Sequence, residues 1–325
     1  MSQFISLLEL AVPATTPLLL ACLGEIFSER SGVLNLGIEG LMSIGALTAI
    51  IVVLSGGGLW SGVIMSMVVA GVGALVFAIL TISLKSDQVV SGVMIALLGV
   101  AVANFYGNNW SGETITTFSQ TKLPLIGDFL VSIPYIGELL FMNTPIDYLA
   151  LILVPISWYI LFRTKLGLKI TAAGNESKAA DTMGIDPIKI RYLTVVISGL
   201  FAGLAGAALS LGFTGYWTAN LIDSRGWIAI AIVIVARWDP RKALIGAFAF
   251  GFTYSLQFGL QGFNYERLPL SDALGNTYAF LFDPIIISTY PFVVTIAMLV
   301  FFSIGTNTDL VAPQELAKNY IREGE

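Results

Sequence analysis

Four ionisable side chains and one amide lie close together near the N-terminus, between long apolar runs. They are Glu25, Glu29, Arg30, Asn35 and Glu39, all within the segment GEIFSERSGVLNLGIEG. Ionisable groups at membrane depth are costly unless they are paired or hydrated, so they often mark a substrate pathway. The alternative is an ordinary polar loop with a short surface helix. Four glycines in the segment favour irregular backbone that lines a cavity.

Other kinds of chemistry have no residues to support them. The chain contains no His and one Cys, Cys22, which excludes a disulfide framework and a cysteine metal site. It contains no G-x-x-x-x-G-K-[ST] phosphate loop and no nucleophile–base pair. We therefore expect a non-enzymatic chain with no catalytic residue, no metal and no cofactor of its own.

The composition indicates a membrane protein. Of the 325 residues 56% are hydrophobic and 11% are charged, and the mean hydropathy is +0.85. A soluble domain carries about 25% charged residues. A net charge of −5 without a basic tract argues against nucleic-acid binding. The first apolar segment lacks a preceding basic region, so we expect it to be retained rather than cleaved.

Apolar segments long enough to cross a membrane alternate with polar links, and two segments are too short. The expected spans are Phe4–Leu23, Leu59–Leu84, Val89–Tyr106, Tyr148–Phe162, Leu193–Phe213, Ala243–Leu260 and Pro284–Ile304, and the short segments are Leu41–Leu54 and Trp227–Ala236. This pattern predicts an all-α, polytopic membrane protein with about eight to ten transmembrane helices, some short or interrupted at the pathway. We expect one domain over 1–325, with a cytoplasmic loop at 163–192 and a polar tail at 305–325 that ends in a short surface helix.

Small residues recur every fourth position in two of the expected spans. One stripe consists of Ser66, Ala70 and Ala74, and the other of Gly199, Gly203 and Ala207. Such stripes let helix backbones approach closely in membranes. Both spans are therefore predicted to be packed inside the bundle along these faces.

The distribution of Lys and Arg sets the expected orientation. Most of them fall on one side when the basic loop 163–191 is placed in the cytoplasm and the spans alternate. This places the N-terminus outside and the C-terminus inside. Arg225 then falls outside, and Arg30 has no assigned side.

Two interruptions of the apolar pattern are alike. FSERSG at 27–32 precedes one short segment, and IDSRG at 222–226 precedes the other. Under the predicted orientation they open to opposite sides. Broken helices in corresponding positions of two inverted halves point to a transport pathway. Two unrelated polar loops are the alternative.

Three blocks of sequence resemble a known family. They are GEIFSERSGVLNLGIEGLMSIGA, AAGNESKAADTMGID and GWIAIAIVIVARWDPRKALIGAFAFG. All three are similar to bacterial ABC importer permeases for nucleosides and simple sugars, within the wider group of ribose and branched-chain amino acid permeases. The chain looks most like the shorter of two nucleoside permease subunits that form a heterodimer.

The resemblance implies a set of partners. We expect a separate ABC ATPase that holds ATP and Mg²⁺, a second permease subunit, and an extracytoplasmic lipoprotein or periplasmic protein that delivers substrate. The loops Gly107–Asp147 and Gln261–Asp283 are candidate landing surfaces for that receptor. We expect the chain to lie in the cytoplasmic membrane of a bacterium as a multi-pass protein.

The central block is expected to dock on the ATPase. Permeases of this kind present Glu-Ala-Ala, three residues and Gly; here Lys178 replaces the Glu. The expected docking residues are Asn175, Lys178, Ala179, Ala180, Met183, Gly184 and Ile185. Asn175 suits the N-cap of a short helix and Gly184 its C-terminal cap. A solvated basic loop is the alternative.

A nucleoside needs polar partners for its ribose and an apolar or aromatic surface for its base. The pathway candidates are Ser28, Glu29, Arg30, Asn35, Glu39, Asn104, Phe105, Trp217 and Trp227. Each single aromatic residue has lipid contact as its alternative role. Two other functions remain open: a permease for simple sugars such as ribose, and an ion-coupled secondary transporter.

Overall fold

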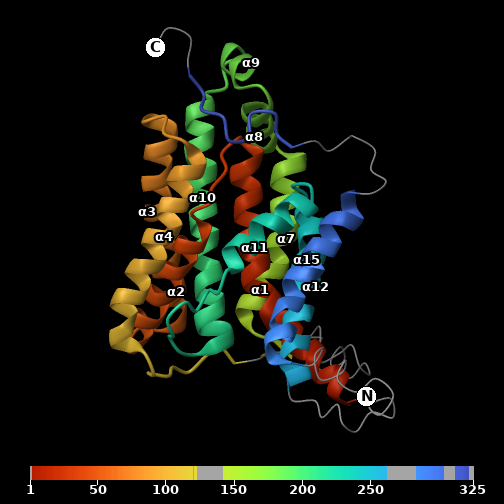
Figure 1. Cartoon of the computed structure of the whole chain (residues 1–325). Coiled ribbons are helices and arrows are strands. Elements are labelled where there is room, and N and C mark those ends of the chain that lie inside the picture. Colours follow the sequence, from red (N-terminus) through yellow and green to blue (C-terminus); the bar gives the residue numbers. More distant parts are fainter. Residues whose placement is uncertain (1, 120, 123–141, 262–282, 304–311, 322–325) are drawn as a thin grey trace.

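The chain folds into a helical bundle, seen here in a computed structural model that describes residues 2–119, 121–122, 142–261, 283–303 and 312–321 (Figure 1). In chain order the helices are α1 (Ser2–Arg30), α2 (Ile38–Leu54), α3 (Leu59–Ala78), α4 (Gln88–Gly107), α7 (Pro145–Arg163), α8 (Lys165–Asn175), α9 (Ser177–Thr182), α10 (Pro187–Ala207), α11 (Arg225–Val235), α12 (Pro240–Gln261) and α15 (Pro284–Ser303). Strands β1 (Thr121–Lys122) and β2 (Met142–Asn143) form a small antiparallel pair. The all-α prediction is confirmed.

Five helices of the described part of the chain are long and apolar enough to cross a membrane. They belong to α1, to α3 with its π-helical extension Ile79–Ser83, to α4, to α7, and to α10 with its π-helical extension Ala208–Thr214. Helices α2 and α11 are shorter, as predicted. Every backbone N–H and C=O group in lipid needs a hydrogen-bond partner within the protein. A continuous helix provides these partners within each spanning segment.

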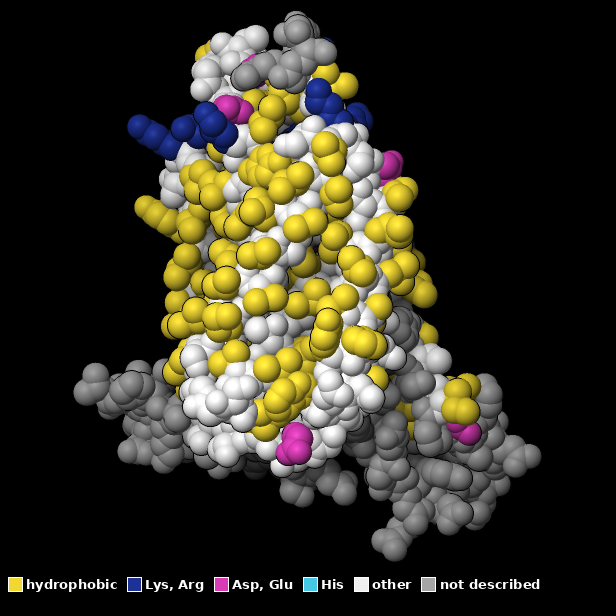
Figure 2. Space-filling model, turned by 90° about the vertical axis from the view of Figure 1, so that its left-hand side faces the viewer, with side chains coloured by type: hydrophobic (Ala, Val, Ile, Leu, Met, Phe, Trp, Pro, Cys, Tyr) yellow, Lys and Arg dark blue, Asp and Glu magenta, His cyan; other side chains and the backbone are white. Residues whose placement is uncertain are grey.

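Helix α1 lies at the centre of the bundle, where it contacts α10, α11 and α12 (Figure 1). Its residues 18–23 are all buried. In contrast, α3 and α4 expose large apolar side chains such as Ile64, Val72 and Leu97. Figure 2 shows hydrophobic side chains along the length of one face, with Lys and Arg gathered near one end. This surface suits lipid contact.

The two stripes of small residues pack against each other. A Cβ added at Gly199 would collide with the Ala74 side chain, and one at Gly203 would collide with the Ser66 carbonyl. The Ser66 hydroxyl donates a hydrogen bond of 2.6 Å to the Gly203 carbonyl. The prediction that both faces are packed is confirmed, and the close approach explains the small residues.

The structure differs from two predicted boundaries. Helix α1 does not end at Leu23 but continues to Arg30, so Glu25 and Glu29 lie on regular helix. Gly24 is needed for packing rather than for irregular backbone, because a Cβ there would lie 2.6 Å from the Phe201 Cβ. The described tail, 312–321, forms turns and not the expected surface helix.

One end of the bundle carries α8, α9 and residues 312–321, and we call it the docking end (Figure 1). The basic turn after α11 lies close to it, because the Arg30 guanidinium donates to the Trp238 carbonyl at 3.2 Å and to the Thr171 hydroxyl of α8 at 3.4 Å. Arg30 is thereby placed at this end. Of the predicted landing loops, residues 120 and 123–141 of the first and 262–282 of the second lie outside the described residues.

Candidate functional site

Two links interrupt the helices near the middle of the bundle. The α1–α2 link is residues 31–37, and its Gly32 carbonyl accepts from the Ala317 N–H at the docking end. The α10–α11 link is residues 215–224, and it pairs with residues 111–115 after α4 at the opposite end. The links therefore enter from opposite ends, as the predicted orientation requires.

Glu39 joins the two links. It lies in the first turn of α2, and its carboxylate accepts from the Ser224 N–H at 2.9 Å and from the Gly226 N–H at 2.7 Å. These N–H groups belong to the start of α11, where backbone donors have no intrahelical acceptor. A carboxylate at a helix N-terminus also interacts favourably with the helix dipole. Glu39 thus fixes the start of one short helix against the other.

Close packing accompanies this contact. A Cβ at Gly226 would lie 2.6 Å from the Glu39 Cα, and a Cβ at Gly99 of α4 would lie 2.6 Å from the Gly40 Cα. Only glycine fits at either position without a shift of backbone. The start of α2 is therefore enclosed by α4 on one side and by α11 on the other.

Glu25 shapes the α1–α2 link from within α1. One oxygen of its carboxylate accepts from the Asn35 N–H at 2.9 Å, and the other accepts from the Ser198 hydroxyl of α10 at 3.1 Å. The Asn35 side-chain oxygen in turn accepts from the Gly37 N–H at 3.1 Å. All three side chains are buried. The link is therefore ordered by side-chain contacts rather than by helical hydrogen bonds.

Glu29 reaches the turn between α11 and α12. One of its carboxylate oxygens accepts from the Trp238 indole N–H at 2.6 Å, while the other is buried without a hydrogen-bond partner among the described residues. Ser28, on the same helical turn, donates to the Val33 carbonyl at 2.8 Å. The end of α1 is thus connected both to the α1–α2 link and to the α11–α12 turn.

The α11–α12 turn is held by its own charges. Arg237 and Trp238 have positive φ angles of 53° and 55°. The Asp239 carboxylate accepts from the Arg241 backbone N–H at 2.9 Å and pairs with its guanidinium at 2.9 Å. Partial burial alone would raise the pKa of Asp239, but the contacts with Arg241 and the charge of Lys242 hold that pKa below its ordinary value. The turn is therefore a rigid support for Trp238.

Four of the pathway candidates make no hydrogen bond to Glu39 among the described contacts, although Trp227 directly follows Gly226, which does. Asn104 near the end of α4 exchanges two hydrogen bonds with Asn220, at 2.8 and 3.0 Å. Trp217 is buried against Gly107. Phe105 is 75% exposed on α4, and Trp227 is 39% exposed on α11. Phe105 therefore faces outward from the described chain, away from both links.

Arg225, which the predicted orientation assigns to the outer side, is buried within the bundle rather than exposed. It is buried at the start of α11, where its guanidinium donates to the Ile222 carbonyl at 2.8 Å and lies 4.5 Å from the Tyr254 ring centroid. These contacts satisfy carbonyls of the α10–α11 link and place a cation beside an aromatic face. Counting positive charges by loop could not detect this, because the residue is in a link that re-enters the bundle.

The docking end contains the short helix α9. Asn175 is not its N-cap but the last residue of α8; Glu176 holds the N-cap position and gives no side-chain hydrogen bond. Gly184 is the C-terminal cap, as predicted: its φ is +80°, and the Ile185 N–H bonds the Ala180 carbonyl at 2.9 Å. This is the Schellman arrangement.

The surface of α9 separates the predicted docking residues into two sets. Met183 is 81% exposed, and Lys178 and Ala179 are also exposed. Ala180 is 4% exposed and packs inward. The available face of α9 therefore combines a cation, a small residue and an apolar knob, while Ala180 anchors the helix.

Sequence reasoning missed three residues of these networks. Trp238, Ser198 and Arg191 are each bonded to residues of the N-terminal segment. Arg191, expected in the basic loop, lies instead on α10 and is 2% exposed. A buried arginine in that loop has no distinguishing signal in the local sequence. Trp238, within the block ARWDP, could have been suspected as an indole donor near charged groups.

Comparisons with known proteins identify the family of the chain. Residues 7–302 match the family model described as "Branched-chain amino acid transport system / permease component". The chain is 45% identical to the ABC transporter permease protein TsgC13 of Haloferax volcanii, provisionally assigned to glucose, over 99% of both chains. It is 37% identical to the guanosine ABC transporter permease protein NupQ of Bacillus subtilis, over 92% of this chain and 94% of that one.

A third relative is more distant in sequence. The chain is 28% identical to the nucleoside ABC transporter permease protein NupC of Lactococcus lactis, over 95% of this chain and 94% of that one. The family model covers most of the chain, including both links, α8, α9 and nearly all of α15, and it ends before residues 312–321 of the docking end. The chain therefore belongs to the family of branched-chain amino acid transport system permease components, and it is a membrane permease.

Proposed function

We propose that this chain is the membrane-spanning subunit of an ATP-driven importer of nucleosides. The observation that carries the ATP-driven part is the docking end, where a capped short helix exposes Lys178, Ala179 and Met183 to a partner. The nucleoside part is supported by the similarity to guanosine and nucleoside permeases over more than nine-tenths of the chain.

The partners follow from this role. A separate ABC ATPase docks on α9 and holds ATP and Mg²⁺, and the chain itself supplies no catalytic group. A second permease subunit completes the pathway as a heterodimer, and an extracytoplasmic receptor delivers substrate to the end that carries the loop after α4. The complex lies in the cytoplasmic membrane, with the docking end inside.

In this proposal the two links form the gate that controls access to the substrate pathway. Glu39 connects two short helices that are reached from opposite ends, so a shift of α11 against α2 changes the access of a central space. The buried residues Ser28, Glu29, Asn35 and Glu39 lie on the inner side of this pathway, and the half-buried Arg30 lies at its docking end. Asn104, Trp217 and Trp227 border its outer approach. Because the carboxylates of Glu25 and Glu39 are fully engaged within the chain, their proposed role is to position the links.

A sugar is the second candidate substrate. The relative that is 45% identical over 99% of both chains is provisionally assigned to glucose. A pathway for ribose-containing nucleosides and one for simple sugars share the need for polar groups that bind hydroxyls. The two candidate substrates differ in one respect: a nucleoside also carries a flat base, which the pathway must accommodate.

The test is uptake by cells with and without this gene. We expect the gene to be required for ATP-dependent uptake of labelled nucleosides, with labelled glucose and ribose unaffected. Loss of sugar uptake alone would replace the nucleoside assignment. Uptake that survives ATP depletion but collapses with the ion gradient would contradict the importer proposal altogether.

Docking is tested on α9. Ala179→Arg adds a large cation on the exposed face and should abolish both uptake and co-purification of the ATPase, while the amount of inserted permease stays unchanged. Ala180→Arg is the contrasting variant, because burial of that residue predicts loss of the permease itself. Normal uptake by Ala179→Arg would show that the ATPase binds elsewhere.

A further inference from the structure

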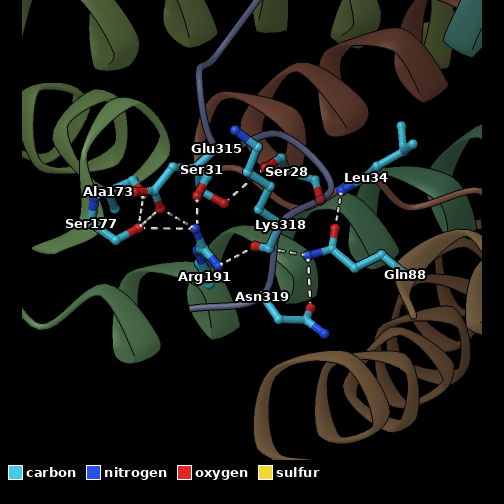
Figure 3. Close-up of polar contacts among 10 residues, drawn as sticks. All are labelled: Ser28, Ser31, Leu34, Gln88, Ala173, Ser177, Arg191, Glu315, Lys318 and Asn319. Atoms are coloured by element: carbon cyan, nitrogen blue, oxygen red, sulfur yellow. Dashed lines mark hydrogen bonds and ion pairs between the residues drawn. The ribbon is translucent and has the colours of Figure 1, made fainter. Parts of the chain in front are cut away.

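The described C-terminal residues cross the docking end as an extended segment with turns. We call residues 312–321 the C-terminal strap (Figure 3). Its backbone is bound to two elements: the Glu315 N–H donates to the Gly174 carbonyl of α8 at 2.9 Å, and the Ala317 N–H donates to the Gly32 carbonyl of the α1–α2 link at 3.2 Å. The strap therefore lies between the docking helices and the link.

Glu315 completes the start of α9. Its carboxylate accepts from the Ser177 backbone N–H at 3.0 Å and also contacts the Ser177 hydroxyl. The N-cap residue Glu176 makes no side-chain hydrogen bond, so this first-turn donor is satisfied from the strap. The orientation of α9 therefore depends on a residue that lies far away in the sequence.

Arg191 extends this contact into the bundle. Its guanidinium pairs with the Glu315 carboxylate at 3.1 Å and donates to the Ser31 carbonyl at 3.2 Å and to the Lys318 carbonyl at 2.9 Å. The side chain is 2% exposed. Charge-assisted hydrogen bonds at a buried position are strong and directional. Arg191 thus joins the strap, α10 and the α1–α2 link.

The far end of the strap makes a further connection. The Gln88 side chain accepts from the Leu34 N–H at 2.9 Å and donates to the Asn319 side chain at 3.3 Å. Asn319 donates to the Lys85 carbonyl at 2.7 Å, and the Tyr320 hydroxyl donates to Asp181 of α9 at 2.9 Å. Figure 3 shows the strap residues between Ser177 on one side and Gln88 on the other.

We propose that the strap makes α9, the α1–α2 link and the turn before α4 move as one body, and that Glu315 is the positioning residue that holds this body together. The inference rests on the proposed function, because it takes α9 as the helix that the ATPase moves. Without the strap α9 keeps its chain neighbours, the packing of Ala180 and the 2.9 Å hydrogen bond from Arg191 to the Ser177 hydroxyl. It loses the contacts with Glu315 and Tyr320, so its displacement reaches the link through fewer contacts.

The test measures transport against ATP hydrolysis in the assembled importer reconstituted in vesicles. Glu315→Ala should lower the substrate transported per ATP hydrolysed about tenfold, a ratio typical of coupling between two sites. The assembled complex and its ATP hydrolysis should remain. Gln314→Ala, at the exposed neighbouring position, is the matched control and should leave the ratio unchanged.

Two results would overturn the proposal. One is an unchanged ratio in Glu315→Ala; the other is loss of transport only in proportion to loss of complex, which indicates a purely structural contact. If Glu315→Ala fails to accumulate, Ser177→Ala provides the second test. It removes the hydroxyl that contacts Glu315, Arg191 and the Ala173 carbonyl, but it keeps the backbone N–H bond to Glu315. It should lower the ratio about threefold, nearer the lower end of such coupling. A wild-type chain without ATP-dependent uptake would instead contradict the proposed function.

Discussion

The α1–α2 link and the α10–α11 link both interrupt the bundle, but they are held by different chemistry. The first is enclosed by buried polar groups, with the charged Glu25 and Arg191 and the neutral Gln88 each bonded to its backbone. The second is held at its outer end by the neutral pair Asn104 and Asn220 and by backbone contacts with the segment after α4. The link at the docking end is therefore bonded to charged side chains, whereas the link at the opposite end has neutral partners at its outer end and contacts the charged Glu39 and Arg225 only at its inner end.

This difference indicates that the two links have different roles in transport. Removal of a buried charged partner costs more than removal of a neutral one, because the remaining group stays desolvated. The α1–α2 link is therefore the stiffer of the two and suits the transmission of force from a partner. The α10–α11 link suits rearrangement when substrate arrives from the other side.

Glu39 lies next to the α1–α2 link and is bonded to the end of the α10–α11 link, so changing it should have the largest effect. Glu39→Ala leaves the Ser224 and Gly226 N–H groups without their acceptor, and each charge-assisted bond contributes about 1.5–3 kcal/mol. We expect uptake to be abolished and the melting temperature of the purified permease to fall by several degrees. Glu113→Ala, an exposed carboxylate after α4, is the control and should change neither.

Trp238→Phe should have the next largest effect, because it removes the hydrogen-bond donor of the Glu29 carboxylate and leaves the ring in place. An unsatisfied buried charged group predicts a loss of about 3 kcal/mol in the free energy of unfolding. The double variant with Glu29→Gln should recover part of this loss, since the neutral amide has a smaller desolvation cost. Denaturant unfolding of the purified protein measures both. Equal stability of the single and double variants would argue against a charge at Glu29.

Asn104→Ala should have the smallest effect of the three. The pair with Asn220 is neutral and partly exposed, so its loss should cost about 1 kcal/mol. We expect a change in the apparent affinity for substrate with little change in melting temperature. Asn109→Ala, at an exposed position of the short 3₁₀ helix that follows α4, serves as the reference. A stability loss as large as that of Glu39→Ala would abolish the distinction between the two links.

The sequence predicts the parts of the fold that depend on local pattern. The short lengths of α2 and α11 followed from their apolar runs, and the stripes at Ser66 and Gly203 followed from four-residue spacing. The predicted end of α1 at Leu23 was wrong, because by local pattern alone the charged residues Glu25 and Glu29 indicate a loop. Their acceptor roles depend on Ser198 and Trp238, whose proximity no local pattern encodes.

The same reason applies to the docking end. Gly184 was predictable as a helix cap because its left-handed backbone favours glycine. The tail was expected to be helical, yet Glu315 and Asn319 bond to other elements instead of to their own turn. Arg191 looked like one cation among several in a basic loop. Its burial is set by the strap, more than 120 residues later in the chain.

The contacts of Glu29 and Glu39 also bear on how the protein is made. Trp238 follows Glu29 by 209 residues, and Gly226 follows Glu39 by 187 residues. During synthesis the first two helices therefore reach the bilayer long before their hydrogen-bond donors exist. The carboxylates need water or a proton until α10 and α11 arrive, so final assembly of the centre follows insertion of the whole chain. An N-terminal fragment ending before α10 should accordingly be degraded rather than accumulate.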